Sequence, residues 1–455
     1  MKPRERIDGL RPVGAGHALV FYGDACSGVP GGPHEATLAA TNDAIQRLDP
    51  QPDFLIFAGD EIVGLTGDEA DLRAQWRHWL DVEMSWLDRT AIPLYHTTSN
   101  HTTYNVMSER VFAEVLDHLP RNGPPTQQGL AYHVRRDDLL VVFVNTCATD
   151  LGGEGMVETA WLDSVLTEHH DATTKLVVGH HPIHPVNGLA GDRQREVAAE
   201  TGRRFWDVLV SHGVVAYLCS HILAFDVQVH RGVLQVLSAG AGTIHRMPPE
   251  TEYLHFVNLA VDDRGLRYRV IDQSGRTRER LAWPPRLPPS ADWIELDDRT
   301  PLPADGALAL RVRGVASAVG DTGAPQTLLA VPGQDPTVDL APLWVGLTGP
   351  SLTLTATVTS GPGRSPHYWF GPNLEPGEPF DLQLLLHRDM GPGGLLYRDA
   401  DSGTWSSLRA ASPWGLEVLP PVTRWLVGRT EHGSPFRGRN LRVSAGLEEI
   451  SRKNP

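Results

Sequence analysis

Residues Phe54-Leu55-Ile56-Phe57-Ala58-Gly59-Asp60 join an apolar run to a glycine and a carboxylate. The run has the character of a buried strand, and Asp60 falls where that strand would end. Four further segments also place an Asp, Asn, His or Cys just after a strand-like run: Phe21-Tyr22-Gly23-Asp24-Ala25-Cys26, Thr98-Ser99-Asn100-His101, Val178-Gly179-His180-His181-Pro182 and Leu218-Cys219-Ser220-His221. The carboxyl ends of strands in an α/β fold converge on one edge, so we expect these polar side chains to meet. Carboxylate, amide and imidazole groups together predict a site for a divalent transition metal such as Fe, Mn or Zn.

The order of these motifs resembles the calcineurin-like metallophosphoesterase superfamily. That family has Asp-x-His, then Gly-Asp, then Gly-Asn-His-Asp/Glu, then a His before a Pro-containing turn, then Gly-His-x-His. The resemblance covers roughly residues 15–275. It implies a four-layer α/β (α+β) fold, in which two β-sheets pack face to face with helices outside. It also implies hydrolysis of a phosphomonoester or phosphodiester by metal-activated water.

The resemblance also implies roles for individual residues. One metal would be held by Asp60, Asn100, His180 and His221, with Asp60 bridging to a second ion. The second ion would take Asp24 and the residue at the first-motif His, which is Cys26 here. In the family the His of the third motif, His101 here, binds no metal and protonates the leaving oxygen. We expect His181 and His184 to line the pocket or to support the ligands.

The sequence departs from the family at several of these positions. Ser99 and Ser220 replace glycines, and Thr102 replaces an acidic residue. Most important, Leu223 stands where the family has the last His, and a leucine cannot coordinate a metal. We therefore predict one tightly held ion, with a second ion possible near Asp24 and Cys26.

Two details of the second position stay open at the level of sequence. Cys26 can be a soft ligand or simply a small buried apolar residue. Asp226 or His230 could replace the lost imidazole, but an offset of three residues along a strand points Asp226 away from the face of Leu223.

Composition narrows the class of protein. The 455 residues suggest two or three domains. A net charge of −15 argues against a non-specific grip on nucleic acid. The three cysteines, Cys26, Cys147 and Cys219, fit neither a zinc ribbon nor a disulfide scaffold. The charged N-terminus lacks the apolar stretch of a signal peptide, and no run approaches the ~20 apolar residues of a membrane span, so we expect a cytoplasmic protein.

The first part of the chain alternates strand-like and helical patterns, which is typical of a layered α/β domain. The expected strands are Ala18–Tyr22, Phe54–Ala58, Pro93–His96, Leu139–Asn145, Lys175–Val178, Val214–Cys219, Val233–Ala239, Phe256–Val261 and Leu266–Ile271. The expected helices are Glu35–Leu48, Glu69–Asp88, Glu109–Leu116, Val157–His169 and Glu196–Ser211. We predict a catalytic domain over residues 1–281.

A proline-rich linker is predicted at 282–290, because proline fixes φ and lacks a backbone donor. Residues 291–455 then alternate apolar and polar positions between Gly/Pro turns, as in the run from Ser351 to Thr359, which predicts an antiparallel β-sandwich. The stretch from Phe380 to Val443 resembles a concanavalin A-like or laminin-G-like jelly roll. The tryptophans of the C-terminal region, Trp369, Trp405, Trp414 and Trp425, can fill the sandwich core or offer a surface to carbohydrate.

The leading hypothesis is a metallophosphoesterase acting on a small-molecule phosphoester. Two alternatives come from other classes. One is a single-metal iron enzyme of oxidative chemistry on the same fold. The other is a glycan-binding protein with a degraded metal site, in which the sandwich carries the function.

Overall fold

A computed structural model describes residues 5–186, 197, 199–244 and 253–284, and in the C-terminal part 293–296, 307–318, 324–332, 341–359, 366–387, 395–399, 403–410, 425–430 and 434–447. The chain divides into two compact units. The first consists of Met1–Val186, Ala190–Val227 and Val233–Pro284. The second consists of Asn187–Leu189, Gln228–Gly232 and Pro285–Pro455.

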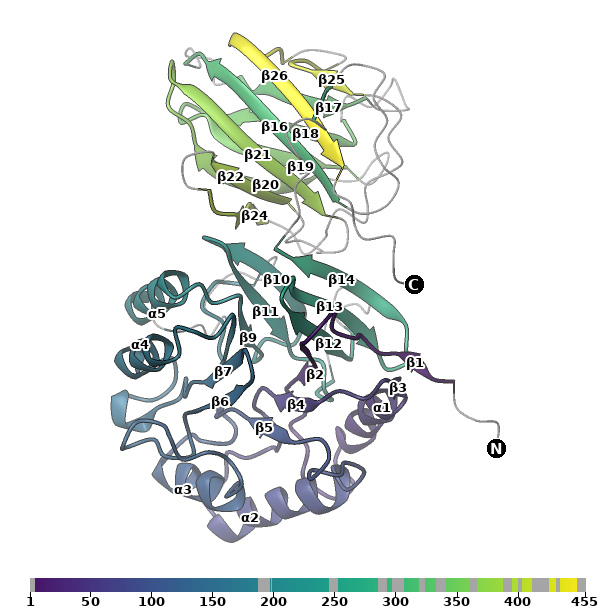
Figure 1. Ribbon diagram of the computed structural model, residues 1–455, viewed down its shortest axis with the longest axis vertical. Coiled ribbons are helices and arrows are strands. Elements are labelled where there is room, and N and C mark those ends of the chain that lie inside the picture. The colour runs from purple at the N-terminus through teal and green to yellow at the C-terminus, as the bar shows by residue number, and fades with distance from the viewer. Residues whose placement is uncertain are drawn as a thin grey trace. The chain divides into compact units, whose positions relative to one another are not determined.

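The first unit contains two six-stranded sheets, with its helices lying outside them (Figure 1). One sheet has the order β14 (Thr277–Trp283), β13 (Gly265–Asp272), β12 (His255–Asp262), β2 (His17–Tyr22), β4 (Phe54–Phe57) and β5 (Leu94–His96). The other has the order β10 (Phe225–His230), β11 (Val233–Ser238), β9 (Ala216–Cys219), β8 (Thr174–Val178), β7 (Leu139–Phe143) and β6 (Tyr132–Arg136). Strands β1 (Ile7–Asp8) and β3 (Leu48–Asp49) form a small parallel pair.

Parallel pairing sets the direction of the strands that end in the polar motif residues. Strands β2, β4 and β5 are mutually parallel neighbours, and so are β7, β8, β9 and β11. The helices are α1 (Glu35–Gln46), α2 (Glu69–His78), α3 (Val106–Val115), α4 (Thr159–Glu168) and α5 (Ala199–Ser211), with a π-helix at Trp79–Glu83 and a 3₁₀ turn at Thr149–Leu151. Strands β4 and β8 are buried along their whole length, as expected for strands covered on both faces.

The nine expected strands are present, with ends that differ by one to two residues. The pattern missed β6 and β14, whose residues are mostly polar and only partly buried. The expected strands also do not include the two-residue strands β1 and β3 or the buried strand β10. The predicted helix Glu35–Leu48 ends at Gln46 because Leu48 pairs with Ile7 in a parallel bridge. The predicted helix Glu69–Asp88 continues past α2 as the π-helix and ends at Glu83. Helix α3 begins before Glu109 because Asn105 and Ser108 form a capping box.

The second unit contains two six-stranded antiparallel sheets. One has the order β15 (Ile294–Glu295), β26 (Gly438–Leu447), β16 (Ala307–Ala316), β21 (Pro379–His387), β22 (Leu395–Asp399) and β23 (Ser406–Ser407). The other has the order β24 (Arg409–Ala410), β20 (His367–Asn373), β19 (Thr353–Val358), β18 (Leu343–Thr348), β17 (Gln326–Val331) and β25 (Leu426–Val427). Residues from both sheets form one apolar core, so the unit is built as a sandwich.

The tryptophans of the second unit occupy different places. Trp369 and Trp425 are buried in the shared core. The Trp405 ring lies beneath the Arg398 guanidinium, 5.2 Å from ring centroid to cation. Trp414 and the glycine-rich segment that begins at Gly391 lie outside the described residues.

The stretch predicted as a linker starts within the first unit. Ala282 and Trp283 are the last residues of β14 and pair with Arg267 and Leu266 of β13. Residues 285–292 lie outside the described part of the chain. Within the described residues, none of the helices combines the length and the apolar character needed to cross a membrane.

Candidate metal centre

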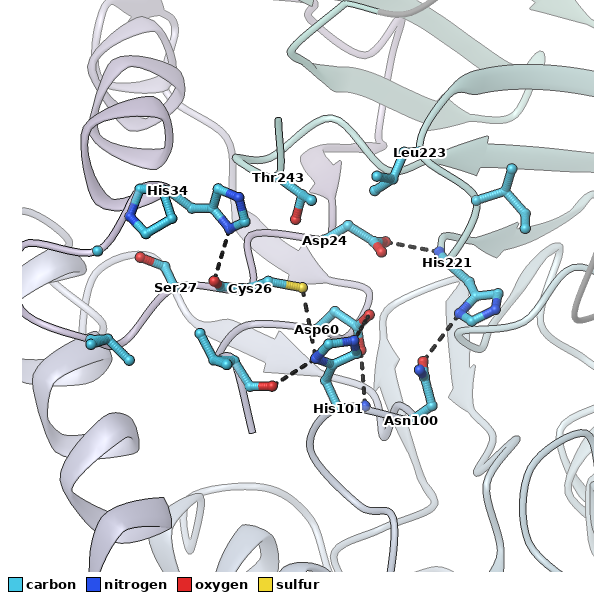
Figure 2. Close-up of a pocket in the computed structure, with 15 residues that line it drawn as sticks. Asp24, Cys26, Ser27, His34, Asp60, Asn100, His101, His221, Leu223 and Thr243 are labelled. Carbon is cyan, nitrogen blue, oxygen red and sulfur yellow. Dashed lines mark hydrogen bonds and ion pairs between the residues drawn. The ribbon is translucent and has the colours of Figure 1, made fainter. Parts of the chain in front are cut away.

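Five strand ends bring polar side chains together; Asp24, Asp60, Asn100 and His221 line one pocket (Figure 2), and His180 is buried next to it. In the first sheet, Asp24, Asp60 and Asn100 follow β2, β4 and β5. In the second sheet, His180 and His221 follow β8 and β9. Each group of strands is parallel, so their carboxyl ends lie at the same edge.

Three donor atoms, from Asn100, His180 and His221, lie close to one another, and the Asp60 carboxylate contacts one of them. The Asn100 Oδ1 atom lies 2.9 Å from His180 Nε2 and 3.1 Å from His221 Nδ1. The two imidazole nitrogens are 3.1 Å apart. The Asp60 Oδ1 atom lies 3.4 Å from His180 Nε2. Ligands bound at about 2.0–2.2 Å from one ion are separated by about 3–3.5 Å, so the donors of Asn100, His180 and His221 fit a single divalent metal, and Asp60 adjoins them through His180.

Hydrogen bonds behind the donors prepare His180 for coordination. Its Nδ1 lies 2.8 Å from the carbonyl oxygen of Ala58, which fixes the proton on Nδ1 and leaves the Nε2 lone pair facing the cluster. Burial lowers the pKa of His180, although the Asp60 and Asp24 carboxylates oppose this. The imidazole is therefore neutral, as a metal ligand must be.

The backbone is strained where the donors lie. Asp24, Cys26, Asp60 and His221 have φ values of 63°, 43°, 57° and 75°. Left-handed conformations are uncommon outside glycine and gather at functional sites. Gly59, with φ of 91°, has no room for a side chain, because a Cβ would lie 2.6 Å from Ser99 Cβ and 2.7 Å from His180 Nδ1.

The second position is built from different groups. Asp24 accepts hydrogen bonds from the Ser220 hydroxyl and from the His221 amide, the latter at 2.8 Å. Burial and the neighbouring Asp60 carboxylate raise the pKa of Asp24 to about 7. Burial also raises the pKa of Asp60, but the His180 and His101 imidazoles outweigh it and the net shift is downward.

Cys26 and Leu223 complete the lining on this side. The Cys26 thiol lies 3.9 Å from His101 Nδ1. Burial, followed by the Asp60 and Asp24 carboxylates, raises the pKa of the thiol well above its usual value. Without a cation Cys26 is therefore a neutral thiol. Leu223 lines the same pocket and offers no donor.

His101 lies on the pocket wall beside Asp60. Its Nδ1 is 2.7 Å from the Val63 carbonyl oxygen, and its Nε2 is 3.9 Å from Asp60 Oδ2. The His101 amide also points at Asp60 Oδ1, 3.3 Å away. The ring is thus held by the backbone, and the residue lines the cavity without joining the donor cluster.

His181 and His184 do not line the pocket. His181 is buried beside the donors: one of its nitrogens lies within 4.8 Å of those of His180 and His221, and its ring centroid is 4.4 Å from that of His221. Its nitrogens pair with Thr146 Oγ1 at 2.9 Å and Glu154 Oε1 at 3.2 Å. His184 packs its ring edge on Trp206, with the ring centroids 4.5 Å apart.

The two residues considered as replacements for the lost imidazole also lie elsewhere. Asp226 is a buried residue of β10, and its charge contributes to raising the pKa of the Cys219 thiol. His230 ends β10 and its Nε2 lies 3.1 Å from Gln228 Oε1. Neither residue lines the pocket.

Sequence reasoning missed two features of the site. His34 lines the pocket just before α1, and its Nδ1 lies 3.0 Å from the Cys26 carbonyl oxygen (Figure 2). Beneath Asp60, the fully buried Glu61 and His96 pair at 2.8 Å. Burial raises the pKa of Glu61 well above, and lowers the pKa of His96 well below, the usual values, so the pair is neutral. Only the position of Glu61 beside Asp60 hinted at this pair in the sequence.

No model of a known protein family matches the chain, and no curated protein matches it in sequence. Solved structures do resemble it. GAP50 of Plasmodium, an inner membrane complex anchor, is 14% identical over 59% of this chain and 88% of its own, with a TM-score of 0.43. Purple acid phosphatase PPD1 of yellow lupin is 12% identical over 60% of this chain and 55% of its own, with a TM-score of 0.44.

A third similar structure is the phosphopantetheinyl hydrolase PptH of Mycobacterium tuberculosis. It is 16% identical over 50% of this chain and 91% of its own, with a TM-score of 0.30. These TM-scores are low, so the chemistry of the centre is inferred from its own residues.

Replacing His180 by Ala should remove the tightly bound ion. The loss of affinity should exceed the ~10–100-fold that removal of an outer hydrogen-bond partner costs, because a ligand itself is lost. Elemental analysis after dialysis measures the ion, and circular dichroism checks the fold. His170→Ala, which changes an exposed His, is the control and should keep its metal. Full occupancy in His180→Ala would reject the ligand set.

Replacing Asp24 by Asn should stabilise the metal-free protein at high pH. The folded-state pKa of about 7 lies above the ordinary aspartate pKa of 3.8, so ionisation of Asp24 lowers stability as pH rises from about 4 to about 7. The amide can still accept from Ser220 and His221. At pH 8 the variant should gain up to about 4 kcal/mol, and much less at pH 4.5. Urea unfolding in the presence of a chelator measures the gain in unfolding free energy at both pH values. An equal gain at pH 8 and pH 4.5 would contradict the assignment of the effect to the ionisation of Asp24.

Proposed function

We propose that the chain is a metal-dependent phosphoester hydrolase. The observation that carries this proposal is the convergence of Asp60, Asn100, His180 and His221, whose donor atoms lie 2.9–3.4 Å from their neighbours. These donors are neutral or carry a single negative charge, so a bound divalent ion keeps a net positive charge toward an anionic phosphoryl group. When bound, the ion supplies Lewis acidity to the phosphoryl oxygen and activates water for attack.

The protein's own residues supply position and protons. Asn100 and the two ligand imidazoles fix the place of the phosphoryl group, because their donor atoms are held by the ends of three strands. His101 stands beside Asp60 with Nδ1 tied to the Val63 carbonyl. This hydrogen bond fixes the ring so that Nε2 can hold a proton for the leaving oxygen.

The pocket provides room for an organic ester. Its volume is about 820 Å³, and it reaches from the donor cluster to His34 and Thr243. A pocket of this size takes a small-molecule substrate. We therefore propose a small phosphoester as the substrate and assign the chemistry to the first unit.

The second unit is proposed to be a concanavalin-like sandwich that serves substrate positioning or assembly. Its two antiparallel sheets and their shared core support the sandwich. A carbohydrate ligand for it stays a prediction from the sequence.

Oxidative chemistry with iron is a second candidate, because the imidazoles of His180 and His221 and the carboxylate of Asp60 are the residue types that bind Fe(II) in many oxygenases. The fourth donor, Asn100, and the placement of His101 favour hydrolysis. Metal analysis and a measurement of oxygen uptake separate the hydrolase from the iron enzyme, since hydrolysis proceeds under anaerobic conditions and oxidation does not.

Replacing His101 by Gln tests the proposed proton donor. For an alkyl ester the turnover number should fall by about 10²–10⁴, because a poor leaving group needs protonation. For a p-nitrophenyl ester the fall should be much smaller, since that leaving group departs as the anion. Metal content should stay the same. An equal loss with both esters would contradict the role of His101.

Replacing Leu223 by His tests the incomplete second position. The native protein should hold about one tightly bound ion per chain after dialysis, and Leu223→His should hold nearer two, because an imidazole would join Asp24 and Asp60. Ile222→His is the control, since it adds an imidazole to the neighbouring pocket residue. Two tightly held ions in the native protein would show that Cys26 or another group already completes the position.

A further inference from the structure

Exposed apolar side chains gather at the mouth of the metal pocket. Among the described residues, the large apolar side chains that are more than a third exposed are Val29, Val63, Leu65, Val82, Val106, Ile244, Ile294 and Tyr368. Val29 and Val63, exposed to 38% and 41%, line the pocket itself. Leu65 follows Val63 by two residues, and Ile244 follows the lining residue Thr243. Single exposed apolar residues are ordinary, but a group of them beside a pocket indicates a ligand surface.

The apolar lining continues from this rim to the donors. Ile222 and Leu223 come directly after His221 and line the pocket, as does Pro33 on the opposite strand-end loop. A ligand whose charged group reaches the donor cluster would therefore lay its remaining atoms along apolar side chains. This is the surface that an alkyl or aryl group prefers, because its burial removes apolar area from water.

The rim is held in place by polar contacts. Around Val29, the Glu83 carboxylate accepts from Ser27 Oγ at 2.7 Å and from the Gly28 amide at 3.2 Å. Near the other end of this loop, Glu35 accepts from the Gly31 amide at 2.7 Å. His78 Nε2 joins the two carboxylates, 3.1 Å from Glu35 and 3.7 Å from Glu83.

Val63 is anchored directly to the site. Its amide donates to the Ser27 carbonyl at 2.9 Å, and its carbonyl accepts from His101. The two exposed valines are therefore fixed before any ligand arrives. Preorganised apolar surface of this kind adds affinity because little conformational entropy is lost on binding.

The charges of the pocket indicate which phosphoester fits. The described lining residues include the carboxylates Asp24 and Asp60 and no Lys or Arg. One divalent ion, bound by Asp60, Asn100, His180 and His221, carries two positive charges. These charges balance the Asp60 carboxylate and one negative charge of the phosphoryl group. A phosphodiester carries a single negative charge, whereas monoesters and polyphosphates carry two or more at neutral pH and would need further cations.

We propose that the substrate is an amphiphilic phosphodiester, whose phosphoryl group faces the donor cluster and whose alkyl or aryl group lies along Leu223, Val63 and Val29. The proposal rests on the hydrolase function above and names its substrate class. The same chemistry occurs in soluble alkyl esters and in phospholipids.

A series of alkyl p-nitrophenyl phosphates from methyl to octyl tests the proposal with the metal-loaded full-length protein. Each methylene buried in the pocket should raise kcat/KM roughly two- to fourfold, mostly through KM, so octyl should exceed methyl at least tenfold. The double variant Val29→Ser with Val63→Ser should reduce the octyl-to-methyl ratio about fivefold or more. Val106→Ser is the control, because Val106 is 73% exposed and does not line the pocket.

The outcomes separate the substrate class from the function. Hydrolysis that does not depend on chain length, or an unchanged ratio in the double variant, would overturn the substrate class and leave the hydrolase proposal standing. If no ester is cleaved, the hydrolase proposal fails. Calorimetry then compares the binding of octyl methylphosphonate with that of methyl methylphosphonate, and this comparison tests the apolar surface separately. Tighter octyl binding that the double variant weakens supports the apolar surface, and equal binding overturns it.

Phosphatidylglycerol vesicles form a second arm of the experiment. Cleavage of the vesicle lipid would assign the apolar group to a membrane lipid. Cleavage limited to monomeric esters below their micelle concentration would assign it to a soluble ester. Either result supports an amphiphilic phosphodiester.

Discussion

Two carboxylates, Asp24 and Asp60, are buried side by side at the meeting point of two sheets, and the rest of the centre is arranged around this constraint. Burial, and after it the repulsion between the two like charges, raises the pKa of Asp24 to about 7. Both residues also have left-handed backbone conformations. A fold that keeps strain and uncompensated charge in one place gains from a cation there, and the imidazoles of His180 and His221 add further donors.

The departures from the family pattern are connected to these same carboxylates. Ser99, in place of a glycine, accepts from the Asp60 amide at 2.9 Å, and its hydroxyl lies 2.8 Å from that of Thr102, which replaces an acidic residue. Ser220, in place of another glycine, donates to Asp24. The substituted residues thus form hydrogen bonds that hold the ligands, and the charge lost at Thr102 makes the surroundings of Asp60 less negative.

The sequence was sufficient to predict that the polar side chains at the strand ends lie close together. It was insufficient to predict the residues that surround these side chains. The donors could be predicted because each follows an apolar run, and parallel strands of that kind share one edge. The Glu61–His96 pair, His34 and the exposed Val29 and Val63 depend on packing between segments far apart in the chain, for which no local pattern exists. Strands β6 and β14 were missed for a related reason, since their polar residues are partly exposed and carry little periodic signal.

The two sides of Asp60 are chemically unequal, and this asymmetry connects the centre to its pocket. On one side, Asn100, His180 and His221 present three donors that carry no charge, so the ion keeps its positive charge for a ligand. On the other side, the imidazole expected from the resemblance is a leucine, and apolar side chains continue from it toward the pocket mouth. Leu223 offers no donor at this position and adds apolar surface to the pocket that the Asp60, Asn100 and His221 side chains also line. A centre with one strong cation and an apolar flank favours ligands that combine a single negative charge with an apolar group, because any additional charge would lie against Leu223 without compensation.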